Sequence, residues 1–356
     1  MYPTPDMLAG LIPESFFAAR AEWPLWLMAA FGIAVLVFGA DRAVGAGAKL
    51  AAALGMSKVI IGATVVSLGT TSPEAVVSVR AAWMGDPGLA LGNGVGSIIA
   101  DTALIFGLCC LLRRLPLDSF VLNRHGWLQL GSGVLLVGLS LVLLAVAGDI
   151  NNVFIPRWAG VGLLVLLVVY LYLSVKWARR HPEILEGLDV EVEAPAKSTV
   201  GTSIYQLLMV LFGLALVIGG AEMLIGSVQE ISIRRGVPSA VLAVTLVAFG
   251  TSLPELATAL AAILKGHGDM MVGNIVGADI LNVLFVVGAS ATATRLQVQP
   301  YFFYLFFPVM MFVLILLRIF IFTSGSSFRR WQGVPLLGAY VVFIWLTLHF
   351  GVAASV

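Results

Sequence analysis

The chain has 356 residues, of which 60% are hydrophobic and only 11% are charged, and its mean hydropathy is +1.03. Soluble domains carry about a quarter charged residues, and a soluble fold could not bury this much apolar surface. The composition therefore predicts a multi-pass protein of the cell (inner) membrane. The net charge of +1 excludes the basic face of an electrostatic nucleic-acid binder, and two adjacent cysteines exclude a disulfide scaffold.

A membrane-spanning helix needs about 20 mainly apolar residues. Ten stretches qualify: 24–45, 57–83, 88–112, 126–148, 157–178, 204–227, 238–264, 270–291, 300–323 and 332–354. We therefore predict an all-α fold with an N-terminal extracytoplasmic segment at 1–23 and five-helix repeats at 24–178 and 204–356. The polar stretch 179–203 joins the repeats. Because 14 of the 20 Lys and Arg residues then fall on the linker side, this linker is predicted to be cytoplasmic and both termini outside.

The two halves match each other when the chain is shifted by 181 residues. Gly69–Glu74 (GTTSPE) falls on Gly250–Glu255 (GTSLPE), and Gly92–Gly96 falls on Gly273–Gly277. Five spans precede each restart, so the second copy is inverted in the membrane. Inverted repeats are typical of secondary transporters, whose ion site lies near the midplane between the repeats. The alternative at this level is a duplicated structural bundle that transports nothing.

Both matched motifs place Pro and Gly inside an apolar stretch. Pro removes a backbone donor and clashes with the preceding turn, while Gly permits unusual dihedrals. We therefore expect spans 2 and 7 to be broken helices. Backbone carbonyls freed there, near Ser67 and its counterpart Ala248, cannot be satisfied by lipid, but a bound cation can satisfy them.

Glu74 and Glu255 lie in the middle of these spans, where a charge costs about 3 kcal/mol. Since no Lys or Arg is predicted at similar depth, the compensating charge must come from protons or metal ions. If spans 3 and 8 cross the broken helices, Asp101 and Asn282 join the cluster. Nearby hydroxyl groups belong to Thr70, Thr71, Thr251, Ser252 and Ser97. This all-oxygen set suits a hard cation such as calcium, whereas zinc and copper favour Cys and His.

Some features remain open at this level. Asp279 has no acidic counterpart, because Ile98 occupies the equivalent position, and it either supports the ligands or lines the cavity, or else contacts an ion itself. Asn93 and Asn274 either position a helix or bind an ion. Asp41 and Glu222 either line an ion entrance or reach water at span ends. The four histidines are expected to be solvated at loops or span ends.

The paired motifs resemble the two alpha repeats of the calcium/cation antiporter superfamily, most closely its prokaryotic sodium/calcium exchanger-like branch. The resemblance implies one calcium site flanked by sodium sites, with spans 1 and 6 sliding across the other spans. It implies that Glu74 and Glu255 ligate calcium and share it with sodium. It further implies hydroxyl ligands at Thr70, Thr71, Thr251 and Ser252, carbonyl ligands at Ser67 and Ala248, and ligands from spans 3 and 8 at Ser97, Asp101, Ala278 and Asn282.

Two departures bear on the counter-ion. The family commonly has Asn at the position of Asp101 and Asp at that of Asn282, so the charge has moved to the other repeat. In addition, Ala278 lacks the hydroxyl of the usual Ser. Both changes leave sodium stoichiometry open.

The sequence thus predicts an antiporter that exchanges Ca²⁺ for Na⁺ or H⁺ by alternating access. The alternatives are an antiporter for another cation pair (Mn²⁺/Mg²⁺ or Na⁺/H⁺) and an intramembrane enzyme that uses the carboxylates as acid and base. We expect no enzyme activity, no catalytic residues and no cofactor. The expected partners are inorganic cations and the lipid bilayer, without nucleic acid, and the sequence is compatible with a monomer.

Overall fold

Helices make up almost all of the described chain. The computed structural model describes residues 12–54, 56–83, 85–116, 119–180, 200–235 and 252–351. The first half contains α1 (Glu14–Ala18), α2 (Glu22–Leu54), α3 (Lys58–Ile61), η2 (Gly62–Val66), α4 (Ser67–Thr70), α5 (Ser72–Trp83), α6 (Pro87–Ile99), η3 (Ala100–Phe106), α7 (Gly107–Leu112), β1 (Leu115–Pro116), α8 (Ser119–Ala147), η4 (Ile150–Asn152), β2 (Phe154–Ile155) and α9 (Arg157–Arg180). The second half contains α10 (Val200–Arg234), α13 (Leu253–Leu264), α14 (Gly268–Leu281), η7 (Asn282–Val287), α15 (Gly288–Ala293), β3 (Leu296–Gln297), η8 (Phe302–Phe306), α16 (Phe307–Thr323), β4 (Ser327–Phe328), η9 (Arg330–Gln332) and α17 (Gly333–Gly351).

The long apolar helices account for a multi-pass membrane fold. Seven helices of the described chain are long and apolar enough to cross a membrane, and the bent pair Lys58–Thr70 and Ser72–Trp83 brings the number to eight. Predicted span 238–264 coincides in its second half with α13, while its first half lies mostly outside the described residues. Predicted span 332–354 coincides with α17. The count of ten spans therefore stays a prediction.

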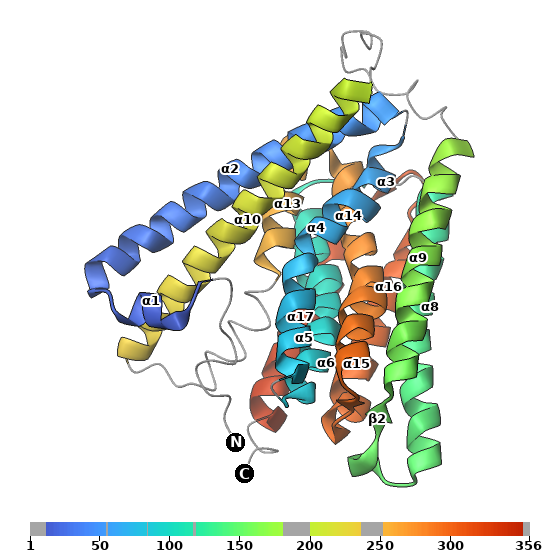
Figure 1. The fold of residues 1–356 in the computed structure, drawn as a ribbon. Coiled ribbons are helices and arrows are strands. Elements are labelled where there is room, and N and C mark those ends of the chain that lie inside the picture. Colours follow the sequence, from blue (N-terminus) through green and yellow to red (C-terminus); the bar gives the residue numbers. More distant parts are fainter. Residues whose placement is uncertain are drawn as a thin grey trace.

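Helices α2 and α10 form a tilted pair on one side of the molecule (Figure 1). They contact each other far more extensively than either contacts the remaining helices. Four glycines make this possible, Gly32 and Gly39 on α2 and Gly213 and Gly220 on α10. A Cβ atom built on Gly39 would lie 2.7 Å from the carbonyl oxygen of Gly213, and one built on Gly220 would lie 2.7 Å from that of Gly32. We call this backbone-to-backbone contact the glycine seam.

The four glycines of the seam are two pairs of repeat counterparts. Gly213 and Gly220 are the counterparts of Gly32 and Gly39 under the shift that aligns the two sequence motifs. Each glycine of α2 faces the counterpart of the other, so that Gly32 meets Gly220 and Gly39 meets Gly213. Such an exchange of partners is what two antiparallel copies related by a pseudo-twofold axis produce.

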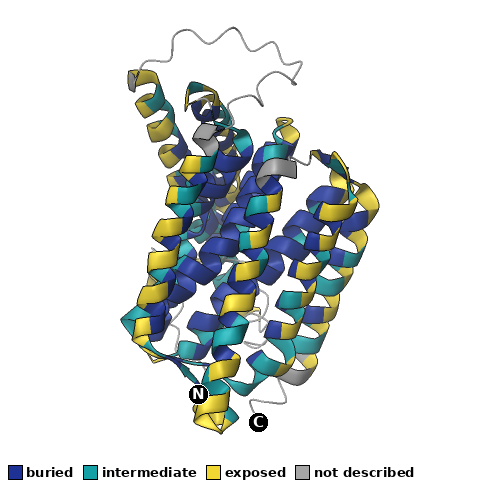
Figure 2. Ribbon diagram, turned by 90° about the vertical axis from the view of Figure 1, so that its right-hand side faces the viewer, coloured by how far each residue is buried: buried dark blue, intermediate teal, exposed yellow. Residues whose placement is uncertain are grey.

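Two continuous helical spans form the centre of the remaining helices. In the most apolar part of residues 268–293 (α14, η7 and α15), 94% of the residues are buried, and in that of residues 87–112 (α6, η3 and α7) the share is 78%. The corresponding share in α2, α8, α9 and α10 is only 22–33%. Figure 2 shows buried residues concentrated in the interior and exposed residues on the outer helices. Both central spans contain a π-helical segment at corresponding places, η3 and η7. Such segments widen a helix and are frequent at functional sites.

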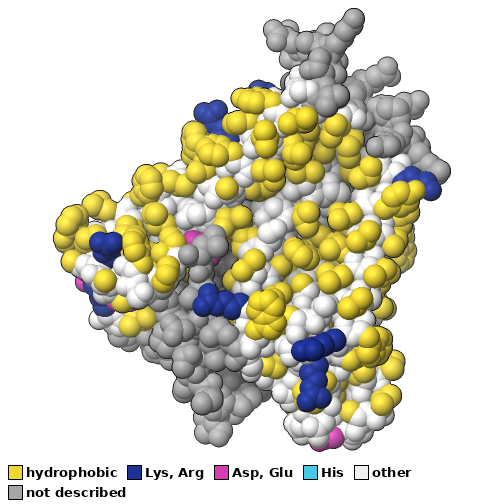
Figure 3. Space-filling model, in the orientation of Figure 1, with side chains coloured by type: hydrophobic (Ala, Val, Ile, Leu, Met, Phe, Trp, Pro, Cys, Tyr) yellow, Lys and Arg dark blue, Asp and Glu magenta, His cyan; other side chains and the backbone are white. Residues whose placement is uncertain are grey.

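Two short antiparallel ladders connect loops that are distant in the sequence. Strand β1 pairs with β4, placing Leu115 opposite Phe328, and β2 pairs with β3, placing Phe154 opposite Gln297. Two-residue strands carry no readable periodicity, so the sequence did not predict them. On the face shown in Figure 3 hydrophobic side chains predominate and acidic ones are few, as expected for a surface that meets lipid.

Candidate functional site

The second span bends where the GTTSPE motif lies. The axes of Lys58–Thr70 and Ser72–Trp83 differ by 41° across Thr71. Pro73 occupies the first turn of α5, where its missing N–H has no acceptor to lose, and Glu74 follows it in the same turn. The carbonyl oxygen of Ser67 accepts from the Thr71 amide at 2.9 Å and from the Thr70 hydroxyl at 3.2 Å. In this conformation the Ser67 carbonyl is thus already hydrogen-bonded.

The seventh span repeats this arrangement in the part that is described. Helix α13 begins directly after Ser252, with Pro254 and Glu255 in its first turn. Both glutamates therefore sit at the positive end of a half-helix, which favours a negative charge. The predicted ligands Ala248 and Thr251 lie outside the described residues.

Three predicted carboxylates converge although they come from three different helices. Glu74 and Glu255 are each 1% exposed and Asp101 is fully buried. Each of the three acts electrostatically on at least one of the others, and Glu74 interacts with both Glu255 and Asp101. The structure thus brings α5, α13 and η3 together around one group of acids.

Polar side chains complete this group, which we call the carboxylate cluster. The Thr71 hydroxyl donates to Oε1 of Glu255 at 3.4 Å, and Nδ2 of Asn282 donates to Oδ2 of Asp101 at 3.5 Å. Thr70 also acts electrostatically on Glu255, and Ser252 acts on Asp101 although no well-formed hydrogen bond joins them. Ser97 lies four residues before Asp101 and is 2% exposed.

Many oxygens of the carboxylate cluster are buried without a hydrogen-bond partner in the described chain. They are both carboxylate oxygens of Glu74, Oε2 of Glu255, Oδ1 of Asp101, Oδ1 of Asn282 and the hydroxyl oxygens of Ser97 and Ser252. A buried acceptor left unsatisfied costs free energy, and a buried unpaired charge costs far more. A hard cation would satisfy these oxygens together, because calcium takes six to eight oxygen ligands.

Three ion pairs of the described chain lie away from this cluster. They join Arg234 to Glu230, Arg235 to Glu22 and Lys265 to Asp41. Within the described residues no three His, Cys, Asp or Glu side chains are arranged to hold a metal ion by themselves. A cation bound here would therefore also need hydroxyl, amide or backbone oxygens, which the cluster contains.

Two asparagines hold the helices that carry the glutamates. Nδ2 of Asn93 donates to the Ser78 hydroxyl at 2.9 Å and to the backbone carbonyl of Glu74 at 3.3 Å. Nδ2 of Asn274 donates to the Thr258 hydroxyl at 3.2 Å, and that hydroxyl in turn donates to the Glu255 carbonyl at 3.1 Å. Of the two roles that the sequence left open, these contacts support helix positioning.

Sequence analysis named Asp279 but missed its two hydrogen-bond partners, Gln129 and Thr102. Asp279 on α14 accepts a hydrogen bond from Nε2 of Gln129 at 2.6 Å and another from the Thr102 hydroxyl. All three side chains are at most 2% exposed. Gln129 is a polar residue within predicted span 126–148, and this signal could have drawn attention to it.

The expectation that all four histidines are solvated is wrong for His125. This residue is 1% exposed, and its Nδ1 lies 3.2 Å from the hydroxyl oxygen of Tyr170. That hydroxyl donates to the carbonyl oxygen of Ala63 in η2 at 3.0 Å. The physical reason is that α8 begins at Ser119, earlier than the predicted span, so that His125 lies inside the helix and faces α9.

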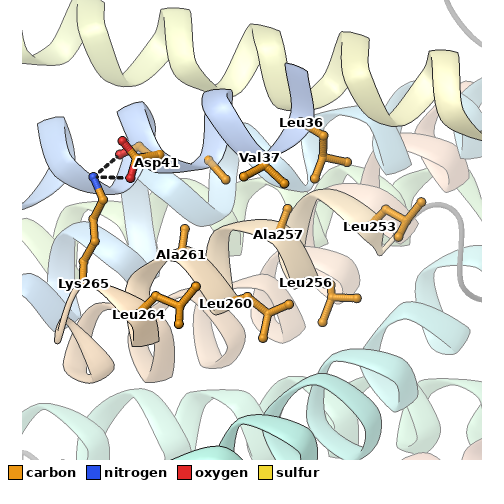
Figure 4. A pocket seen from close by; sticks show the side chains of 11 residues that line it. Leu36, Val37, Asp41, Leu253, Leu256, Ala257, Leu260, Ala261, Leu264 and Lys265 are labelled. Carbon is orange, nitrogen blue, oxygen red and sulfur yellow. Dashed lines mark hydrogen bonds and ion pairs between the residues drawn. The ribbon is translucent and has the colours of Figure 1, made fainter. Parts of the chain in front are cut away.

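Asp41 lies at the mouth of an apolar crevice between α2 and α13 (Figure 4). Its Oδ1 is 2.8 Å from Nζ of Lys265, which also donates to the Asp41 carbonyl at 2.6 Å. The crevice encloses about 290 Å³, and apart from this ion pair it is lined by Leu36, Val37, Ala40, Leu253, Leu256, Ala257, Leu260, Ala261 and Leu264. Among the described residues that line this crevice, Asp41 and Lys265 are the only charged ones, and they are paired with each other.

Comparisons with known proteins show the family of the chain. The profile of the family described as sodium/calcium exchanger protein matches residues 24–176 and 205–349. The chain is 30% identical to the sodium/calcium exchanger MaX1 of Methanosarcina acetivorans, over 90% of this chain and 97% of that protein. It is 33% identical to the inner membrane protein YrbG of Escherichia coli, over 90% of this chain and 94% of that protein.

The fold is similar to that of a solved exchanger. A structure of the sodium-calcium exchanger NCX_Mj, soaked in 10 mM Na⁺ without Ca²⁺, superposes with a TM-score of 0.74 and 27% sequence identity. The match covers 91% of this chain and 97% of that one. The matched family, MaX1 and NCX_Mj are described as sodium/calcium exchangers, which are transporters and not enzymes, and this removes the intramembrane enzyme from the alternatives. Profile, sequence and fold lead to the same conclusion: the chain belongs to the sodium/calcium exchanger family of membrane cation antiporters.

Proposed function

We propose that this protein exchanges Ca²⁺ for Na⁺ or H⁺ across the inner membrane by alternating access to the carboxylate cluster. The observation that carries the proposal is the convergence of Glu74, Glu255 and Asp101 with unpartnered oxygens around them. Acids that repel one another in a buried site are stabilised only when cations or protons occupy it. A site that is unfavourable when empty crosses the membrane loaded, and obligatory loading is the physical basis of exchange.

The ligand set of the proposed calcium site combines the two halves of the chain. Glu74, Thr70, Thr71, Ser97 and Asp101 come from the first half, and Glu255, Ser252 and Asn282 come from the second. The carbonyls of Ser67 and Ala248 and the hydroxyl of Thr251 complete the proposed set. Oxygen is the only ligand atom throughout, which favours calcium over the softer transition metals.

The proposed moving part is the pair α2 and α10. The glycine seam joins these helices to each other, whereas their contacts with the rest of the molecule are sparse by comparison. In this proposal the pair slides as a unit over the remaining helices and exposes the carboxylate cluster first to one side of the membrane and then to the other.

The proposed topology is ten spans in two inverted repeats, with broken helices 2 and 7 and both termini outside. The bend at Thr71 and the exchange of partners across the glycine seam support it. A cysteine-accessibility experiment tests the orientation. Cysteines introduced in 179–203 should react with a membrane-impermeant maleimide only after the inner side is opened, and those in 1–11 should react in intact cells.

The function is tested with purified protein in liposomes. Uptake of ⁴⁵Ca²⁺ is measured under a sodium gradient, under a proton gradient and under neither. Stimulation by one gradient identifies the counter-ion, whereas uptake that responds to neither gradient contradicts exchange. Competition by unlabelled Ca²⁺, Mn²⁺ and Mg²⁺ in the same assay decides between calcium and the alternative cargo ions.

A further inference from the structure

A tyrosine of α9 is hydrogen-bonded to the part of span 2 that precedes the GTTSPE motif. The Tyr170 hydroxyl donates to the Ala63 carbonyl oxygen in η2 at 3.0 Å. Tyr170 is 3% exposed and Ala63 is fully buried, so water does not compete for this bond. Helix α9 supplies none of the proposed calcium ligands. The bond therefore links a helix without ligands to the span that carries Glu74.

The bond compensates for one that η2 lacks. In an α-helix the Ser67 amide would donate to the Ala63 carbonyl, four residues earlier. In η2 the Ser67 amide donates to the carbonyls of Gly62 and Thr64 instead, and its bond to Gly62 spans five residues as in a π-helix. Because a buried carbonyl that loses a partner is unfavourable, the Tyr170 hydroxyl favours the π-helical form of η2 over the α-helical form.

His125 of α8 orients the Tyr170 hydroxyl. Its Nδ1 lies 3.2 Å from the hydroxyl oxygen. Because the single proton of the hydroxyl is donated to Ala63, the oxygen can only accept from His125, which places the imidazole proton on Nδ1. Nε2 of His125 is then an acceptor, and it is buried without a partner in the described chain. A neutral His125 thus holds the Tyr170 hydroxyl toward η2.

The residues at the start of span 2 are held in place by α14. A Cβ atom built on Gly273 would overlap the Val59 carbonyl, and one built on Gly62 would lie 2.9 Å from the backbone nitrogen of Asn274. Backbones that touch in this way leave little room for rotation. A change in the form of η2 would therefore turn the residues that follow it and not those that precede it.

The form of η2 consequently sets the direction of the ligands in span 2. A π-helical turn contains one residue more than an α-helical turn, so conversion of one turn would rotate the following residues by about 100°. Thr70, Thr71 and Glu74 would then no longer be directed toward Glu255. In the π-helical form, by contrast, the Thr71 hydroxyl donates to Oε1 of Glu255 at 3.4 Å.

We infer that Tyr170 is a positioning residue of the ion site, which holds η2 in its π-helical form and thereby directs Thr70, Thr71 and Glu74 toward the cation. His125 supports it by orienting the hydroxyl. Neither residue touches the cation in this account. The inference rests on the proposed function, because it takes the three residues of span 2 as ligands of the transported calcium.

The test compares two tyrosines of the same helix. Tyr170→Phe removes the hydroxyl and keeps the ring, and Tyr172→Phe, at a side chain that is 64% exposed, is the matched control. Binding of ⁴⁵Ca²⁺ to the purified full-length protein in detergent gives the calcium Kd and the amount bound at saturation. Tyr170→Phe should raise the Kd by about threefold to tenfold at an unchanged saturation level, because one hydrogen bond that holds the competent form is lost. Tyr172→Phe should bind calcium like the wild type.

The Kd separates positioning from a purely structural role, which would lower the melting temperature and leave the Kd of the folded protein unchanged. A wild-type Kd in Tyr170→Phe therefore overturns the inference. His125→Phe acts through the same hydroxyl, so adding it to Tyr170→Phe should weaken binding no further. A double variant whose loss is the sum of the single losses also overturns the inference.

Two further outcomes are decisive. If Tyr170→Phe does not fold, a wild-type calcium Kd in His125→Phe overturns the inference in its place. A wild-type protein that binds no calcium contradicts the proposed function, and the inference falls with it. A wild-type protein that binds calcium, beside a Tyr170→Phe variant that binds it equally well, contradicts the inference alone.

Discussion

Asn282 donates its amide to Asp101 at 3.5 Å, and the two residues are 181 positions apart, the same shift that superposes the two sequence motifs. They are thus repeat counterparts that meet at the centre of the molecule. Asp101 carries a carboxylate and Asn282 a neutral amide, so the first repeat supplies the charge of this pair. The contact itself does not depend on which residue carries the charge.

This contact predicts the outcome of a charge exchange. Asp101→Asn should lower the apparent calcium affinity by at least about tenfold, or about 1.4 kcal/mol, because one charged ligand is lost. Adding Asn282→Asp should restore most of that affinity, since the carboxylate returns within hydrogen-bonding distance of the same place. The measurement is ⁴⁵Ca²⁺ uptake against calcium concentration. A double variant as weak as Asp101→Asn would contradict a shared position.

Replacing a cluster glutamate should affect stability and transport in opposite directions. Glu74→Gln removes one of several mutually repulsive buried charges, so the ion-free protein should gain about 1 kcal/mol of stability. Exchange should nevertheless be lost. Calcium at about 100 times its Kd stabilises a binding protein by ~2.7 kcal/mol, and this calcium-dependent gain should disappear in the variant.

Thermal unfolding in detergent, with and without calcium, measures both effects. Ser15→Ala, a neutral change in the exposed part of α1, serves as the control and should keep the calcium-dependent gain. If the Glu74→Gln variant transported calcium and was stabilised by it like the wild type, Glu74 would not be a ligand.

The glycine seam allows a matched comparison of neighbouring glycines on α10. A Cβ on Gly220 would lie 2.6 Å from the backbone nitrogen of Leu36, whereas a Cβ on Gly219 would meet no atom within 4 Å. Gly220→Ala should therefore cost about 1–3 kcal/mol by overpacking and should slow exchange. Gly219→Ala should leave the exchange rate unchanged, and it should leave the stability unchanged or raise it by up to ~1 kcal/mol. Melting temperatures and exchange rates that were equal in the two variants would disprove the close contact.

The ion pair between Lys265 and Asp41 predicts a small effect that depends on salt. Lys265→Gln removes a link between α2 and the end of α13. Because the pair is partly exposed, it contributes at most ~1 kcal/mol, and the exchange rate should change by no more than about fivefold. The rates of wild type and variant, measured at low and at high choline chloride, should converge as salt screens the pair. A variant effect that persists at high salt would indicate a contribution from packing.

The acids of the site were predictable from the sequence, because a mid-membrane charge that occurs twice with a fixed shift has few explanations. Glu74 and Glu255 were recognised in this way, whereas Asp101 was recognised by its spacing from the matched motif Gly92–Gly96. Their convergence followed from the assumption that spans 3 and 8 cross the broken helices. The partners of Asp279 were not predictable. Gln129 belongs to a span outside the repeat motifs, and which face of α8 is directed toward α14 depends on packing between helices that are far apart in the sequence.

Other parts of the fold were beyond sequence reasoning for similar reasons. The π-helical segments η3 and η7 depend on one extra residue per turn, which leaves no mark in an apolar sequence. The burial of His125 depends on where α8 begins, and helix boundaries are uncertain by several residues when they are read from hydropathy. The glycine seam was not predicted, because its four glycines stand out from the other glycines of the apolar spans only by their contacts in the folded chain.

The glycine seam has a consequence for how the two sides of the membrane communicate. Where two helices touch through their backbones, no side chain can rotate away to let one move while the other stays. In the proposed mechanism, the displacement of this pair that closes the path from one compartment would also be the displacement that opens the path to the other. This rigid coupling would keep the two paths from being open at the same time, while the need of the carboxylate cluster for a bound cation would prevent the empty site from crossing.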